Sequence, residues 1–115
     1  MNTMTKTAED VIHECVEKFS LLFEQGDVAK AKETIDETLE SLTTGFGKDQ
    51  IADFLVMLGD VFFQNSHFKE AMEPYKGALE IRLEQLGDKH PDTAKSYETV
   101  GKVFVKEDNF ESAEE

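Results

Sequence analysis

The sequence IADFLVMLGDVFFQNSHFKEAME, residues 51–73, decides the fold, because a similar segment, TAKSYETVGKVFVKEDNFESAEE, follows at residues 93–115. The offset is 42 residues, with small residues falling on small ones and aromatic residues on aromatic ones. The identical positions are Ala52/Ala94, Gly59/Gly101, Val61/Val103, Phe62/Phe104, Phe68/Phe110, Ala71/Ala113 and Glu73/Glu115. A period of this length is typical of arrays in which neighbouring helix hairpins bury each other's apolar faces. The repeat therefore predicts an all-α solenoid.

Apolar residues recur every three or four positions through most of the chain, which predicts amphipathic helices. Thr7 and Asp10 have the spacing of a capping box at the start of the first one. We expect helices over about 8–25, 28–42, 49–64 and 68–86, a fifth from Pro91, and a short C-terminal helical stub from Phe110 after a cap at Asp108 or Asn109. The chain then holds about five helices plus the stub.

These elements group into a single domain over 8–115, preceded by a disordered tail over 1–7. Its parts are repeat 1 over about 8–45, repeat 2 over about 49–87 and a partial repeat 3 over about 91–115. A stub of about five residues is too short to cover the apolar stripe of the helix before it. We therefore expect either that the protein continues past Glu115 or that a second chain supplies the cover, with self-association as a consequence.

Two small residues predict where the helices pack most closely. Gly59 and Gly101 fall inside predicted helices, where glycine costs about 1 kcal/mol relative to alanine, so we expect both to admit a neighbouring helix. Cys15 is the only cysteine and lies among apolar residues at helical spacing, which predicts a small buried side chain rather than a reactive one.

The charge composition argues against nucleic acid and anionic membranes as partners. The chain has 25 acidic and 12 basic side chains, which gives a formal net charge of −13. Such a surface repels phosphates over most of its area. The N-terminal residues have no apolar run of the kind that a secretory signal needs, so we expect a cytoplasmic protein.

No arrangement of reactive side chains predicts catalysis. His13 and Cys15 are two residues apart on a predicted helix and diverge, so they cannot easily share a metal ion. His67 falls in a turn and His90 in a connector, and neither has a nucleophile at a motif spacing. We expect no enzymatic activity, no metal and no cofactor.

Repeat 2 resembles the tetratricopeptide repeat at Leu58, Gly59, Phe62, Phe68, Ala71, Tyr75 and Ala78. More specifically, Pro74, Leu86-Gly87 and His90-Pro91-Asp92 are similar to the 42-residue repeats typified by kinesin light chain. The resemblance covers about 50–115 well, and repeat 1 only in outline. It implies an array of antiparallel helix hairpins that holds a partner protein.

In that family the first helix of each hairpin lines a concave face that binds peptides or helices. By this resemblance the binding residues are Asp53, Val56, Asp60, Phe63, Gln64, Lys95, Glu98, Lys102, Val105 and Lys106. Phe63 and Val105 would bury an apolar side chain of the partner. Lys95, Lys102 and Lys106 share one helix face and would favour acidic neighbours, unless they pair with Glu98 and other carboxylates of the protein.

The resulting prediction is a non-enzymatic protein-interaction or scaffold module. One alternative is a structural module that associates with itself, as a homodimer, through the uncovered end at 94–115. The other is a regulatory arm of a longer enzyme.

Overall fold

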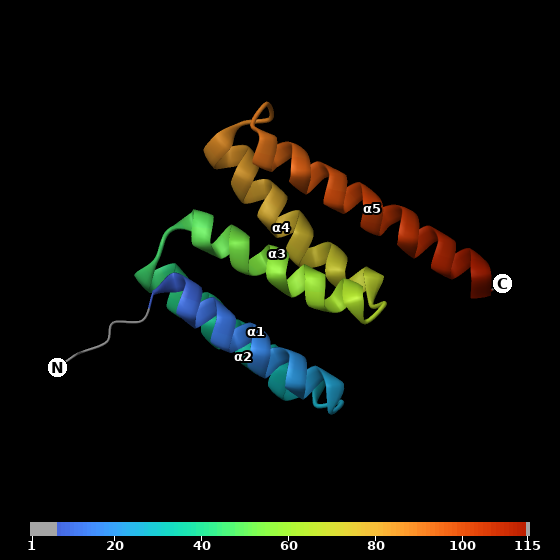
Figure 1. Cartoon of the computed structure of the whole chain (residues 1–115), viewed down its shortest axis with the longest axis horizontal. Coiled ribbons are helices and arrows are strands. Elements are labelled where there is room, and N and C mark those ends of the chain that lie inside the picture. Colours follow the sequence, from blue (N-terminus) through green and yellow to red (C-terminus); the bar gives the residue numbers. More distant parts are fainter. Residues whose placement is uncertain (1–6, 115) are drawn as a thin grey trace. The chain divides into compact units, whose positions relative to one another are not determined.

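The computed structural model describes the backbone of residues 7–114 and the side chains of residues 7–108. Apart from Thr7, the expected N-terminal tail lies outside the described residues, as do the side chains of the expected stub. Every described element is an α-helix, which confirms the all-α part of the prediction (Figure 1). The helices are α1 (Ala8–Glu24), α2 (Val28–Gly45), α3 (Lys48–Gln64), α4 (Phe68–Leu86) and α5 (Pro91–Glu114).

The expected break between the fifth helix and a stub is wrong. The helix α5 runs without interruption from Pro91 to Glu114, so Asp108 and Asn109 lie inside it. The other hairpins turn where a residue adopts a positive φ, at Gly26 (82°), Ser66 (63°) and Gly87 (85°). Asp108-Asn109 shows no such conformation and contains neither glycine nor proline, so the i→i−4 hydrogen bonds can continue.

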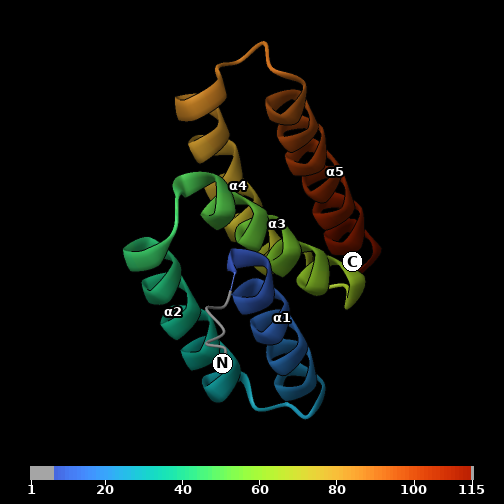
Figure 2. The same ribbon diagram turned by 60° about the vertical axis from the view of Figure 1, so that its left-hand side comes forward.

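The chain divides into two compact units, one up to Ile51 and one from Ala52 onward. In the first, α1 and α2 form the antiparallel hairpin seen in Figure 2. The predicted capping box is present, since the Thr7 side chain accepts from Asp10 N–H and the Asp10 carboxylate accepts from Thr7 N–H. Asp27 caps α2 by accepting from Lys30 N–H at 3.2 Å.

The core of the first unit is built from one stripe of each helix. From α1 it takes Ile12, Cys15 and Phe19, and from α2 Ala31, Thr34, Thr38 and Leu42. Cys15 is buried as predicted, and its Sγ lies 3.8 Å from the carbonyl oxygen of Thr34. Burial raises the pKa of the Cys15 thiol, against the opposing effects of a Thr38 hydrogen bond and the Lys18 charge. The thiol is therefore poorly suited to act as a nucleophile.

In the second unit, α3, α4 and α5 share a core centred on the first turns of α4. Ala71, Met72 and Tyr75 from α4 and Val103 from α5 are buried together, and Phe62 of α3 packs against them. The buried Gly59 of α3 makes room for the Tyr75 ring: a Cβ at this position would lie 2.6 Å from Tyr75 Cε1. Such a separation is a steric clash, so any larger residue here would force the Tyr75 ring to move.

The expectation for Gly101, the counterpart of Gly59 in the repeat, is wrong. Gly101 is exposed, and a Cβ built on it would meet no atom within 4 Å. The physical reason is that no described helix packs on this side of α5 as α4 packs on α3.

Arg82 of α4 joins all three helices of the second unit through polar contacts. Its guanidinium donates to Ser96 Oγ on α5 at 2.8 Å and lies 3.4 Å from the Asp53 carboxylate on α3. Its backbone carbonyl accepts from the hydroxyl of Thr93, which is fully buried. Because Ser96 is also buried, its hydrogen bond is shielded from water and contributes more than the exposed ion pair with Asp53.

We predict opposite effects of alanine at the two repeat-related glycines. Gly59→Ala should lower the free energy of unfolding by about 1–3 kcal/mol, because the new methyl group forces the Tyr75 ring to move. Gly101→Ala should raise it by about 0.5–1 kcal/mol, because helix propensity improves and nothing is displaced. Urea denaturation followed by circular dichroism measures both, and equal effects at the two positions would contradict the packing described.

We expect the loss of the Arg82–Ser96 hydrogen bond to lower stability more than the loss of the Arg82–Asp53 ion pair. Arg82→Met should cost about 1–2 kcal/mol of stability, because Ser96 loses its buried donor. Asp53→Asn should cost less than about 0.5 kcal/mol, because that carboxylate is largely exposed. The same denaturation experiment tests this order, and a larger loss from Asp53→Asn would refute it.

Candidate functional site

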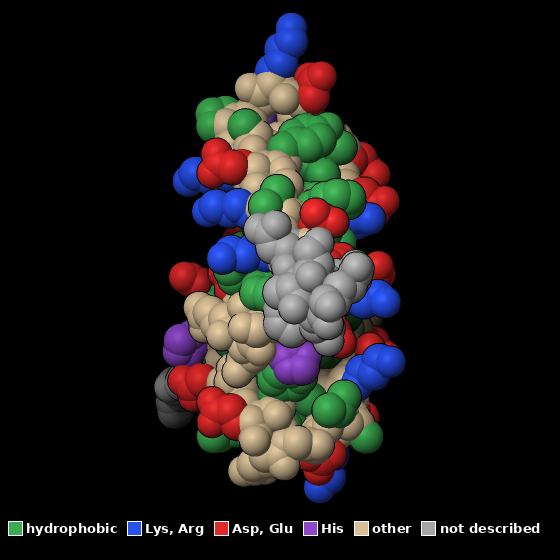
Figure 3. All heavy atoms as spheres, turned by 90° about the vertical axis from the view of Figure 1, so that its right-hand side faces the viewer, with side chains coloured by type: hydrophobic (Ala, Val, Ile, Leu, Met, Phe, Trp, Pro, Cys, Tyr) green, Lys and Arg blue, Asp and Glu red, His purple; other side chains and the backbone are tan. Residues whose placement is uncertain are grey.

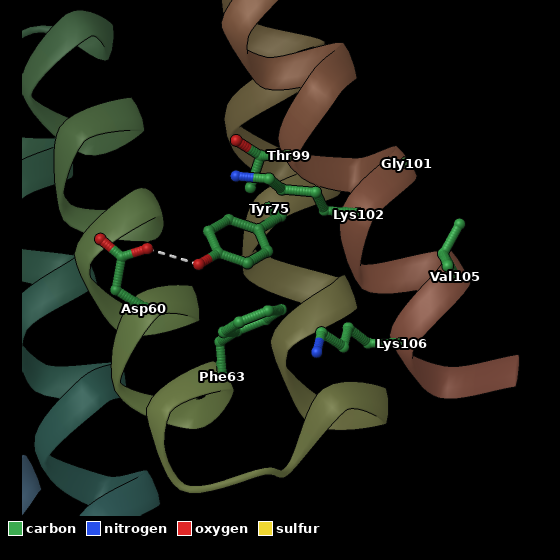
Figure 4. Close-up of a pocket in the computed structure, with 8 residues that line it drawn as sticks. All are labelled: Asp60, Phe63, Tyr75, Thr99, Gly101, Lys102, Val105 and Lys106. Atoms are coloured by element: carbon green, nitrogen blue, oxygen red, sulfur yellow. Dashed lines mark hydrogen bonds between the residues drawn. The ribbon is translucent and has the colours of Figure 1, made fainter. Parts of the chain in front are cut away.

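The second unit contains a hollow of about 670 Å³, which we call the groove (Figure 4). All three helices of the unit contribute to it, Asp60 and Phe63 from α3, Tyr75 from α4 and the others from α5. The lining residues are Asp60, Phe63, Tyr75, Thr99, Gly101, Lys102, Val105 and Lys106. The groove thus combines aromatic rings with two cations and one carboxylate.

Tyr75 and Asp60 form a hydrogen-bonded pair in the groove. The phenol of Tyr75 donates to Asp60 Oδ1, as the dashed line in Figure 4 shows. Tyr75 is buried, and burial raises the pKa of its phenol above the ordinary 10.0, with the hydrogen bond to Asp60 and the Asp60 charge acting in the same direction. The phenol therefore stays protonated at neutral pH and holds the Asp60 side chain against the groove.

Phe63 presents an apolar surface whose position is fixed by the core. Its ring meets that of Phe68 edge-on, with centroids 5.1 Å apart and an interplanar angle of 68°. Phe63 is half-buried and packs against the buried cluster around Ala71. The ring therefore packs on the core and also lines the groove.

Two lysines stand over the groove without an ionic partner of their own. Lys102 and Lys106 are exposed, and Figure 4 shows their side chains reaching from α5 toward Tyr75 and Phe63. Among the residues whose side chains the structure describes, neither ammonium group forms an ion pair, with Glu98 or any other carboxylate. This is unusual in a chain of net charge −13 and leaves both cations available to an external anion.

Half of the ten predicted binding residues line the groove. These are Asp60, Phe63, Lys102, Val105 and Lys106. Of the others, Asp53 lies beside Arg82, and Val56 packs against the buried cluster. Gln64, Lys95 and Glu98 are exposed outside the groove.

Three lining residues were not predicted to belong to the site: Tyr75, Thr99 and Gly101. Tyr75 is one of the positions that carry the repeat resemblance, and its ring belongs both to the buried cluster and to the lining of the groove. Thr99 lies four residues after Lys95 and three before Lys102, so the spacing of the lysine face could have identified it.

Charge is mixed on the surface that Figure 3 shows. Hydrophobic side chains reach the surface there between basic and acidic ones, so that face does not present a field of one sign. The apolar residues that are most exposed in the second unit are on α5: Phe104 at 67%, Val105 at 58% and Tyr97 at 49%.

Other kinds of site are not seen in the described part of the chain. Within it, no three His, Cys, Asp or Glu side chains are close enough to hold a metal ion. None of the described helices is long and apolar enough to cross a membrane.

Comparison with known proteins adds no assignment. The sequence matches no protein-family model, and no curated protein is similar enough to relate it to a family.

The Tyr75–Asp60 pair predicts a dependence of stability on alkaline pH. The raised pKa of Tyr75 means that the folded protein favours the neutral phenol. The stabilisation of the folded state by the neutral Tyr75 phenol is fully present below the unfolded-state pKa near 10.0, and it is lost progressively as the pH rises above that value. At pH 7, Tyr75→Phe should cost about 0.5–1.5 kcal/mol through the lost hydrogen bond.

The difference between the wild type and Tyr75→Phe should therefore shrink between pH 9 and pH 11.5 in urea denaturation. Tyr97→Phe is the matched control, because Tyr97 is exposed. A constant difference for Tyr75→Phe across this range would contradict the interaction.

Proposed function

We propose that the protein is a non-enzymatic interaction module of the tetratricopeptide-repeat type, which binds a peptide or helix of a partner protein in the groove. The observation that carries this proposal is the placement, over an aromatic surface, of two lysines that form no ion pair with any side chain of residues 7–108. Hydrophobic burial against Phe63 would supply affinity, and the lysines would select the charge of the partner.

The volume of the groove limits what it can hold. About 670 Å³ lies within the range of pockets that enclose a small ligand or a few side chains. A segment of a few residues therefore fits, whereas the surface of a folded domain would touch only the rim. We infer that the partner inserts one apolar side chain beside Phe63 and Tyr75.

The charges of the groove predict the residues that flank this anchor. Lys102 and Lys106 are both exposed on α5, and neither forms an ion pair with a carboxylate among the side chains that the structure describes. An Asp or Glu next to the anchor would reach them, and such pairs steer association most strongly at low salt. We therefore propose an acidic segment with one aromatic or large aliphatic residue as the partner, in a cytoplasmic setting.

Selection of peptides from a random display library tests the proposal directly. We expect enrichment of sequences in which Phe, Leu or Met is flanked by Asp or Glu. Lys102→Glu combined with Lys106→Glu should weaken a selected peptide about tenfold or more at low salt, because each exposed ion pair contributes about 0.2–1 kcal/mol and reversal replaces attraction by repulsion. Fluorescence anisotropy measures this change.

Lys69→Glu combined with Lys76→Glu is the matched control. These lysines are exposed on α4, do not line the groove, and give the same change in net charge. We expect their effect to stay within about twofold. An equal loss of affinity in both double variants would mean that net charge, and not the groove, causes the effect, which would contradict the proposal. Unchanged affinity in the groove variant would also overturn it.

A further inference from the structure

The helix α5 has a second surface that no described part of the protein covers. Ala94, Tyr97, Gly101, Phe104 and Asp108 follow one another every three or four residues and so form one stripe, and all five are exposed. Only Gly101 also lines the groove, so the stripe and the groove meet at this residue. The residues that α5 buries, Thr93, Ser96 and Val103, lie on a different face. Exposed rings at Tyr97 and Phe104 mark this stripe as an interaction surface.

We propose that a second copy of this chain packs on the stripe, with its α5 antiparallel to the first. Small and large residues alternate along the stripe as Ala94, Tyr97, Gly101 and Phe104. When two such helices run in opposite directions, one register places Tyr97 opposite Gly101 of the second copy and Phe104 opposite Ala94. Every large residue then meets a small one, and the two-fold symmetry creates each contact twice.

The protein already contains this type of contact. Within the second unit the ring of Tyr75 occupies the space that Gly59 leaves, and α3 and α4 are antiparallel neighbours in sequence. Gly101 is the repeat counterpart of Gly59 and is open, with no atom within 4 Å of a Cβ built on it. The ring of Tyr97 from a second copy fits the same kind of notch.

Charge supports the same register at the ends of the pair. Asp108 lies at the C-terminal end of the described stripe, and in this register it comes opposite His90 of the second copy, next to Lys89. Lys89 and Asp108 are both exposed. The pairing therefore brings opposite charges together at both ends of the interface.

The dimer should be weak and should become stronger with salt. One helix on each side buries less area than a standard stable interface, which places it among transient associations. Two copies with a net charge of −13 each also repel one another at low ionic strength. Peptide binding in the groove should respond to salt in the opposite direction, which separates the two interactions.

Sedimentation velocity of the full chain, without peptide, tests the dimer between about 10 µM and 1 mM in low and high salt. We expect a dimer whose population rises with concentration and with salt. Gly101→Leu should raise its dissociation constant at least tenfold without unfolding the monomer, because the new side chain fills the notch and meets nothing in the monomer. Phe104→Ser should act in the same direction, whereas Leu21→Ser, at an exposed residue of α1, should have no effect.

Disulfide trapping tests the register. Lys89→Cys and Asp108→Cys proteins, mixed in equal amounts under mild oxidation, should form the mixed dimer in preference to either homodimer. Cys15 is buried and should not take part. A monomer at 1 mM in high salt, a dimer unaffected by Gly101→Leu and Phe104→Ser, or a preference for homodimers would each overturn the proposal.

Discussion

The contact between Gly59 and the ring of Tyr75 is the constraint on which the second unit depends. A methyl group at position 59 would overlap the ring, so the absence of a side chain determines how closely α3 and α4 approach. That approach allows the Tyr75 phenol to reach Asp60 and lets the same ring line the groove. Tyr75 also belongs to the buried cluster with Val103, so the contact helps to position α5. The shape of the candidate site is therefore a consequence of core packing.

Local signals in the sequence predicted the helices well, because each signal has a short-range physical cause. Thr7 and Asp10 cap α1, and Gly26 and Gly87 adopt positive φ at the ends of helices. The break expected at Asp108-Asn109 was wrong because these residues favour caps but do not prevent a helix from continuing. The expectation that Gly101 packs closely against a neighbouring helix was also wrong. A repeat shows which residues are equivalent, but it cannot show whether a helix lies next to each of them.

Five of the eight residues that line the groove followed from the repeat resemblance. Asp60, Phe63, Lys102, Val105 and Lys106 lie on the helices that the resemblance selects, and all of them line the groove. Tyr75 could not be found in this way, because its contribution depends on the direction in which a core ring faces. The contacts of Arg82 with Asp53 and Ser96 join residues that are 29 and 14 positions apart, and no sequence pattern connects them.

The turn between α3 and α4 offers a route to a more stable protein. Ser66 holds a left-handed backbone conformation, with φ of 63°, which costs an L-residue about 1 kcal/mol. The turn between α1 and α2 achieves its positive φ with Gly26, which has no such penalty. Glycine at position 66 would release this strain at an exposed residue that does not line the groove. An engineer seeking a thermostable scaffold could therefore begin at this loop and leave the recognition surface unchanged.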